Sequence, residues 1–188
     1  MAILAFSKSV NIGTFHAFQG TKLNSLWSLV TKKLFAKIDS HIAVSLPAMN
    51  FVSKYYPADY KIVPNGVDIQ RFARCDTIDK YQDGKVNILF LGRMEKRKGL
   101  KHLLNAYLSL KQRFPFIRLI VVGSDKPDQR LGSTLKDGTN LDIDWVGQVT
   151  NADVPKYYQA ADIFCAPNTG NESFGIVLLE AMASGKPI

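Results

Sequence analysis

The chain has 188 residues, of which 46% are hydrophobic and 21% charged, a composition typical of a soluble globular protein. Its formal net charge of +8 favours anionic partners such as nucleotide phosphates, acidic lipid surfaces or nucleic acid, without choosing among them. Two isolated cysteines give neither a disulfide framework nor a metal site. Because the apolar runs are far shorter than the roughly 20 residues of a membrane helix and no basic region precedes the first one, we expect a cytoplasmic protein.

In the first half of the chain, short apolar runs alternate with helical patterns. We expect strands at residues 10–15, 41–45 and 61–64, with helices at 24–38 and 48–55 between them. The first helix carries lysines beside an apolar face. Either it packs on its own sheet, which is the commoner case, or it lies on a membrane surface.

A polar, charged stretch at residues 69–84 interrupts this rhythm and is predicted to be a linker. The pattern then restarts, with strands at 86–91, 117–122, 141–146 and 162–166, helices at 99–113, 153–160 and 173–184, and a loop at 123–140. Strands separated by helices in this way predict an α/β fold whose parallel sheets are covered on both faces. We therefore expect two α/β pieces, each with fewer strands than a complete doubly wound domain.

In open parallel sheets, ligands bind outside the carboxyl ends of the strands. The segment LGRMEKRKG, residues 91–99, directly follows a predicted strand. Gly92 allows a sharp turn, and Arg93 and Lys98 stand among four basic side chains suited to a diphosphate. A basic turn that is simply solvated is equally consistent with the sequence.

A second candidate, PNTGNESFGIVLLEAMASG, follows the predicted strand at 162–166. A helix beginning at Glu172 or Ser173 would offer free backbone N–H groups to an anion, and Gly175 would allow close approach. Glu180 lies among apolar residues, where an acid is costly to bury unless it accepts hydrogen bonds. The commoner alternatives are that Glu172 only complements the helix dipole and that Glu180 faces solvent.

A histidine and a pair of aspartates are two further polar features of the sequence. His16 follows the first predicted strand and could orient a ligand, although a lone histidine is more often simply packed. Asp142 and Asp144 match the acidic pattern DxD of some metal sites. They lie inside or just before a predicted strand rather than in a loop after one, so we reject them as metal ligands.

These segments occur in the order of the landmarks of a known family. They are PNGVD at 64–68, LGR…KG at 91–99, VVG at 121–123, VGQV at 146–149, ADIFCAP at 161–167, and a final NESFGIVLLEAMASGKPI in which seven residues separate two glutamates. Over nearly its whole length the chain resembles the retaining glycosyltransferases of group 1 (family 4). In details such as TFHAF it is most similar to the phosphatidylinositol mannosyltransferase branch.

The resemblance implies two Rossmann-like domains of the GT-B type, with an acceptor-side domain in residues 1–68, the linker at 69–84 and a nucleotide-sugar-binding domain in residues 85–188. Arg93 and Lys98 would neutralise the diphosphate of the donor, and Glu180 would accept hydrogen bonds from its ribose. The implied catalytic residues are His16, Arg93, Lys98 and Glu172. The implied donor-binding residues are Gly92, Arg93, Lys98, Val146, Gly147, Val149, Gly170, Asn171, Glu172, Ser173, Phe174, Gly175, Ile176 and Glu180.

The resemblance also implies a reaction. A hexosyl group is transferred with retention of configuration from a GDP- or UDP-linked sugar to a lipid or glycan acceptor. The likeness to the mannosyltransferase branch implies that this group is mannosyl. Basic side chains and helix N-termini stabilise the leaving diphosphate, so no metal or other cofactor is required. Peripheral membrane contact is expected, and a nucleic-acid partner is not.

The chain departs from the family pattern in lacking its beginning and its end. We therefore expect a fragment with two incomplete domains that is catalytically inactive by itself. The alternatives are a module that binds a nucleotide sugar without transferring it, and an inactive truncated product.

Overall fold

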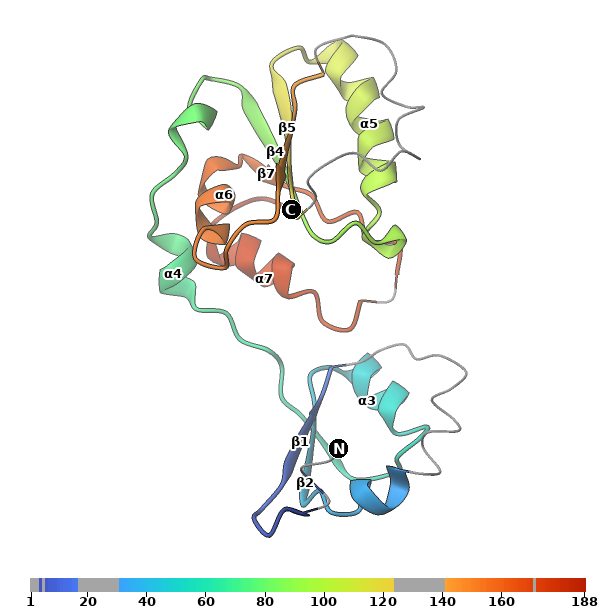
Figure 1. The fold of residues 1–188 in the computed structure, drawn as a ribbon. Coiled ribbons are helices and arrows are strands. Elements are labelled where there is room, and N and C mark those ends of the chain that lie inside the picture. Colours follow the sequence, from blue (N-terminus) through green and yellow to red (C-terminus); the bar gives the residue numbers. More distant parts are fainter. Residues whose placement is uncertain (1–3, 5, 17–30, 124–140, 171) are drawn as a thin grey trace. The chain divides into compact units, whose positions relative to one another are not determined.

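A computed structural model describes residues 4, 6–16, 31–123, 141–170 and 172–188 (Figure 1). The chain divides into two compact units, one formed by residues 1–66 with 171–175 and the other by residues 67–170 with 176–188. Of the helix predicted at 24–38, the described part is helical at 31–35. Within the described ranges, none of the helices combines the length and the apolar composition needed to cross a bilayer.

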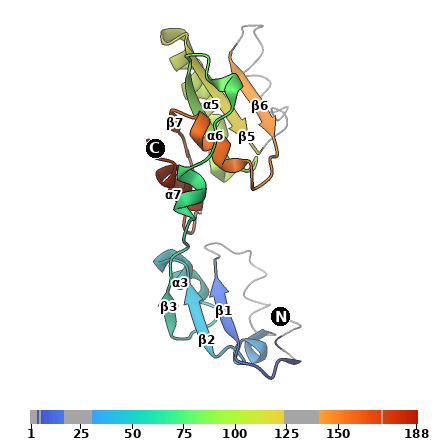
Figure 2. The same cartoon turned by 90° about the vertical axis from the view of Figure 1, so that its left-hand side faces the viewer.

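The first unit holds a parallel sheet of three strands, which Figure 2 shows side by side, and a helix that joins the second strand to the third. These elements are β1 (Ile12–Phe15), β2 (Ser40–Ala43), α3 (Leu46–Val52) and β3 (Tyr60–Ile62). The Oγ of Ser45 caps the helix by accepting from the N–H of Ala48 at 3.2 Å. Pro47 stands in the first turn, where no N–H is needed.

The second unit is built around a parallel sheet of four strands in the order β6-β5-β4-β7. Its elements are α4 (Ile69–Ala73), η1 (Asp79–Tyr81), β4 (Val86–Leu91), η2 (Lys96–Lys98), α5 (Leu100–Arg113), β5 (Ile117–Val122), β6 (Ile143–Gly147), α6 (Val154–Ala160), β7 (Ile163–Phe164) and α7 (Ile176–Ala183). The sequence predicts β4 and β5 residue for residue, whereas β7 is shorter than predicted and α7 begins three residues later.

Helices cover both faces of the second sheet, as the sequence predicts. Along β4, the buried side chains of Ile88 and Phe90 join the cluster beneath α5, and Leu89 between them joins the cluster beneath α4, α6 and α7. This alternation follows from the pleat, which points successive side chains to opposite faces. Figure 1 shows α5 on one side of the strands and α6 and α7 on the other.

The stretch predicted to be a linker, residues 69–84, packs within the second unit. Phe72 of α4 is 3% exposed and Tyr81 of η1 is 4% exposed, and both belong to the core of that unit. The carboxylate of Asp68 caps α4 by accepting from the N–H of Arg71. The division between the units therefore falls near residue 66, because two aromatic anchors attach the polar stretch to the second sheet.

The two aspartates of the DxD pattern are engaged by the protein itself. Asp142 accepts from the ammonium groups of Lys85 and Lys111 at 2.8 and 2.7 Å, and Asp144 accepts from the hydroxyl of Tyr81 at 2.7 Å. These carboxylates stabilise the end of the sheet at which β4 and β5 begin.

The ion pairs of Asp142 are expected to make the free energy of unfolding depend on pH. Hydrogen bonds from Lys111 and Lys85 hold the pKa of Asp142 below its ordinary value of 3.8. The stability that it contributes is therefore complete above that ordinary value and is lost as the pH falls through the lower folded-state pKa. We expect Asp142→Asn to reduce the free energy of unfolding at pH 6 by about 1–3 kcal/mol and to flatten its dependence on pH below 4.

Urea unfolding between pH 2 and pH 6 measures this dependence. Asp153→Asn is the matched control, because Asp153 pairs with Lys156 at the surface, at 2.9 Å, and such pairs add little stability. An acid response of Asp142→Asn that coincides with that of the unaltered chain would show that the paired lysines do not stabilise the fold through Asp142.

Candidate functional site

The strand order creates one place where a ligand is expected in the second unit. The chain runs from β4 outward to β5 and β6, and then returns to β7 on the other side of β4. In such sheets the loops that leave β4 and β7 turn to opposite faces, and the crevice between them, at the carboxyl ends of the strands, is the usual ligand site. Both candidate segments of the sequence follow the carboxyl ends of these two strands.

The loops that follow β4 and β7 are in contact. The N–H of Thr169 donates to the carbonyl oxygen of Arg97 at 2.9 Å. Gly99 approaches the second loop so closely that a Cβ on it would overlap the carbonyl oxygen of Pro167, and its φ of +72° is one that glycine adopts most readily. The structure thus joins the segment 91–99 to the start of the second candidate segment.

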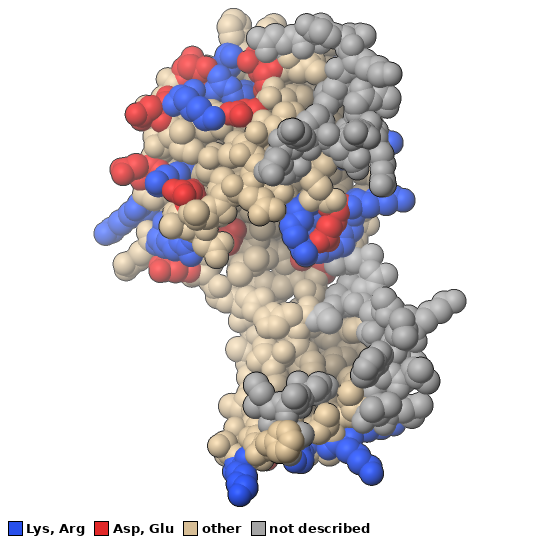
Figure 3. All heavy atoms as spheres, viewed as in Figure 1, with Lys and Arg blue, Asp and Glu red and all other residues tan. Residues whose placement is uncertain are grey.

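The loop after β4 concentrates positive charge around a single carboxylate. Glu95 is 2.8 Å from the guanidinium of Arg93 and 2.6 Å from that of Arg97. Figure 3 shows basic side chains around an acidic group over the segment that joins β4 to α5. The Arg93 side chain is 78% exposed, and exposed ion pairs are weak, so a phosphate can compete with Glu95 for this guanidinium.

Lys98 ends the short helix η2 and lies at the carboxyl end of β4. The aliphatic part of the Lys98 side chain lies beside Gly92, because a Cβ on Gly92 would be 3.9 Å from Cδ of Lys98. The N–H of Gly92 donates to the carbonyl oxygen of Val122 at 3.0 Å, which ties the start of the loop to β5. The ammonium group of Lys98 is therefore carried by a loop that is anchored to two strands.

The final helix begins later than the sequence predicts. α7 starts at Ile176, and Gly175 before it has a φ of +78°, a left-handed conformation that interrupts a right-handed helix. The expectation of a helix beginning at Glu172 or Ser173 is therefore wrong. The N–H groups of Ser173, Phe174 and Gly175 belong to a loop and do not form the first turn of α7.

The residues ahead of α7 group with the first unit. The hydroxyl of Ser45 donates to the carbonyl oxygen of Ser173 at 2.6 Å, and Phe174 packs against the buried side chains of Ala43, Val44 and Ala48. Glu172 is half-buried, and His16, directly after β1, is exposed. Asn171 lies outside the described residues, and Gly170, with a φ of +135°, has open space around it.

Glu180 lies on α7 and is half-buried against α6. The hydroxyl of Tyr158 donates to its Oε2 at 3.0 Å. Burial raises the pKa of Glu180, whereas the hydrogen bond from Tyr158 and the positive charge of Arg71 act to lower it. Sequence reasoning missed Tyr158, because nothing in the spacing of YYQAAD shows which of its tyrosines faces α7.

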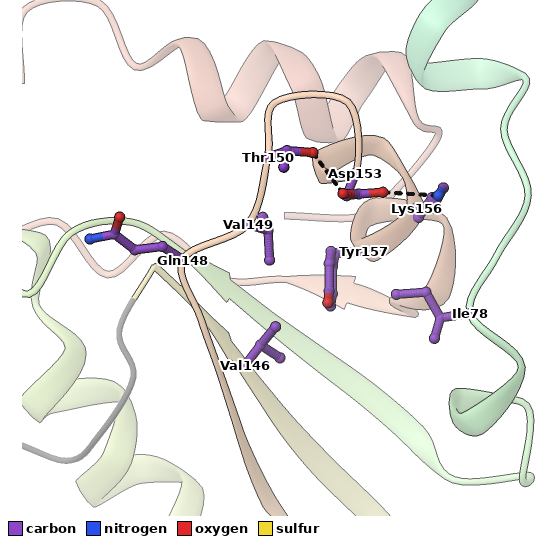
Figure 4. Close-up of a pocket in the computed structure, with 8 residues that line it drawn as sticks. All are labelled: Ile78, Val146, Gln148, Val149, Thr150, Asp153, Lys156 and Tyr157. Atoms are coloured by element: carbon purple, nitrogen blue, oxygen red, sulfur yellow. Dashed lines mark hydrogen bonds and ion pairs between the residues drawn. The ribbon is translucent and has the colours of Figure 1, made fainter.

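The turn after β6 borders a hollow of about 460 Å³ beside α6 (Figure 4). Val146 and Val149 line it together with Ile78, Gln148, Thr150, Asp153, Lys156 and Tyr157. Gly147 has a φ of +82°, which turns the chain there. The basic residues of the 91–99 loop do not line this hollow, so the structure does not bring Val146 and Val149 together with Arg93 and Lys98 in one pocket.

Neither a metal cluster nor an activated thiol is found in the part of the chain that the structure describes. No three His, Cys, Asp or Glu side chains gather there as ligands. Burial raises the pKa of the Cys165 thiol, and burial with the nearby charge of Asp76 raises that of Cys75, so both thiols remain protonated near neutral pH.

The family model described as Glycosyl transferases group 1 matches residues 78–188. The chain is 37% identical over 190 residues to phosphatidyl-myo-inositol mannosyltransferase of Mycobacterium tuberculosis, covering 100% of this chain and 50% of that protein. It is 33% identical over 147 residues to D-inositol 3-phosphate glycosyltransferase of Pseudarthrobacter chlorophenolicus, covering 71% of this chain and 35% of that protein.

The fold has a counterpart among solved structures. HepE of Anabaena, solved in complex with UDP, matches with a TM-score of 0.72 and 23% identity, covering 96% of this chain and 52% of that one. This likeness shows an α/β fold of the GT-B type. The chain spans about half the length of the curated relatives that it matches.

Proposed function

Because the chain belongs to the glycosyl transferases group 1 family, we propose that it acts in a retaining glycosyltransferase. This enzyme would transfer a hexosyl group from a nucleotide-diphosphate sugar to a lipid or glycan acceptor. In this proposal the second unit binds the donor and the first unit faces the acceptor. The observation that supports it best is the contact between the loops after β4 and β7, because Arg93 and Lys98 belong to the first of these loops.

The proposed chemistry follows from the charge that develops during transfer. The bond between the anomeric carbon and the phosphate oxygen breaks, and both electrons leave with the nucleoside diphosphate. The acceptor oxygen bonds to the same face of that carbon, and its proton passes to the leaving phosphate. Arg93 and Lys98 stabilise the new negative charge from fixed positions, which is how such groups lower a barrier most effectively.

Glu180 and the neighbouring loops complete the proposed donor site. Glu180 accepts from ribose hydroxyls, and Val146, Gly147 and Val149 border the base. Glu172 and His16 contact the transferred sugar in this proposal, and Gly170 and Asn171 shape the pocket that holds it. Ser173, Phe174, Gly175 and Ile176 contribute as the loop that enters α7 and not as a helix N-terminus.

Relatives suggest the substrates to test first. Two of them carry mannosyltransferase and inositol phosphate glycosyltransferase names, so we propose a mannosyl donor and an inositol phospholipid acceptor at the cytoplasmic membrane surface. The net charge of +8 supports contact with such anionic lipids. HepE was solved with UDP, and we propose to test UDP-linked sugars as donors beside GDP-linked ones.

A transfer assay tests the proposed function. The full reading frame that contains this chain is incubated with labelled GDP-mannose or UDP-glucose and with vesicles that contain phosphatidylinositol. We expect label to enter the lipid fraction with α-configuration retained, and phosphatidylcholine vesicles to remain unlabelled. Donor binding without transfer would instead identify a nucleotide-sugar-binding module, and the absence of both would refute the proposal.

A further inference from the structure

Tyr158 on α6 is a fully buried residue with a fixed position. It is 0% exposed, and its ring packs against Phe72 of α4 and Phe164 of β7 at centroid distances of 5.7 and 5.2 Å. Aromatic neighbours on two other elements therefore determine where its hydroxyl lies. A side chain held in this way can serve as a rigid support for a functional group beside it.

The hydroxyl of Tyr158 lies against α7. It is 3.0 Å from Oε2 of Glu180 and 3.0 Å from the carbonyl oxygen of Val177. A hydroxyl has one proton to donate, and a bond to an ionised carboxylate is stronger than a bond to a neutral carbonyl. Within the described ranges, the other carboxylate oxygen of Glu180, Oε1, accepts no hydrogen bond.

We propose that Tyr158 is a positioning residue for nucleotide binding, whose hydroxyl holds one carboxylate oxygen of Glu180 so that the other is presented to the ribose. This inference rests on the proposed function, in which Glu180 accepts from ribose hydroxyls. A carboxylate held in place in advance loses less side-chain freedom when the ligand binds, and this raises affinity.

The helices packed against α7 also set the charge of Glu180. α4 and α6 both contact α7. Burial raises the pKa of Glu180, and the two opposing groups are Tyr158 on α6 and Arg71 on α4. Burial and the nearby Glu180 raise the pKa of Tyr158 itself, so its hydroxyl keeps the proton that it donates. Without that hydroxyl, Glu180 is protonated over a wider range of pH and accepts hydrogen bonds less well.

The test measures by calorimetry the affinity for UDP and for GDP between pH 5 and pH 8. It compares the unaltered protein with Tyr158→Phe and with Tyr107→Phe as a matched control. Tyr107 is also 0% exposed, and its hydroxyl donates to the backbone carbonyl of Leu141 at 2.6 Å, away from α7. Both variants lose a buried hydroxyl, and thermal unfolding of each reports the structural cost.

We expect Tyr158→Phe to bind the nucleotide about tenfold more weakly at the acidic end of this range, with the difference narrowing as the pH rises. Tyr107→Phe is expected to follow the unaltered protein at every pH. Coincident pH profiles for Tyr158→Phe and Tyr107→Phe would overturn the inference, since Tyr158 would then contribute packing alone.

Glu180→Gln distinguishes failure of this inference from failure of the proposed function. We expect it to bind weakly, and to show only the dependence on pH that the terminal phosphate of the nucleotide itself contributes, because the amide cannot ionise. Unaltered affinity in Glu180→Gln would remove the ribose contact on which the proposed site depends. Weak binding in Glu180→Gln, together with an unaltered pH profile in Tyr158→Phe, would overturn only the role of Tyr158.

Discussion

Lys98→Ala is expected to lower the rate of sugar transfer by about 10²–10³-fold, the usual effect of removing one group that stabilises transition-state charge. Lys98 follows β4 on a loop that is anchored to two strands, and its Cδ lies 3.9 Å from the position of a Cβ on Gly92. We expect Arg93→Ala to act in the same direction but less strongly, because this guanidinium is exposed and shared with Glu95.

The measurement is the initial rate of labelled sugar transfer at saturating donor and acceptor. Lys101→Ala is the matched control, since Lys101 is an exposed lysine on α5, three residues beyond Lys98. Its rate should stay within about twofold of the unaltered protein, as expected for an exposed surface substitution. If Lys98→Ala and Arg93→Ala also stay within that range, neither side chain stabilises the leaving group and the diphosphate site lies elsewhere.

Gly99→Ala is expected to destabilise the second unit by about 3 kcal/mol or more, which places it among the severe single substitutions. Two effects add. A φ of +72° is strained for alanine by about 1–2 kcal/mol, and the new Cβ would overlap the carbonyl oxygen of Pro167. Relief of that overlap must separate the loops after β4 and β7, so nucleotide affinity should fall together with stability.

Gly84→Ala separates these two effects. Gly84 has a φ of +81°, close to that of Gly99, but nothing lies within 4 Å of the position of its Cβ. It should therefore show the backbone strain alone and leave nucleotide affinity unaltered. Urea unfolding followed by circular dichroism compares the two variants, and equal losses of stability would show that the loops are not closely packed at Gly99.

The sequence predicts the second sheet well because its central strands are buried on both faces. β4 and β5 are apolar at every position except Asn87 and Arg118, and both occur where the pattern places them. The start of α7 could not be predicted in the same way. The apolar run after Ser173 suggests a helix that begins there, whereas the left-handed backbone of Gly175 delays the start of that helix to Ile176. Composition does not reveal such a conformation.

The sequence predicts which segments form the candidate site but not all of the contacts within it. The rule that ligands bind at the carboxyl ends of parallel strands selects the segments after β4 and β7, and the structure shows that these loops touch. The partner of Glu180 could not be found from spacing, because Tyr158 reaches it only through the docking of α6 on α7. The two buried aromatics that attach residues 69–84 to the second unit are equally long-range, and a polar composition concealed them.

A crystal structure of the protein with bound GDP or UDP tests the central proposal most directly. We predict diphosphate oxygens within hydrogen-bond distance of the side chains of Arg93 and Lys98, and a ribose hydroxyl donating to Glu180. A nucleotide bound in any other place, with these three side chains turned toward solvent or toward protein partners alone, would contradict it.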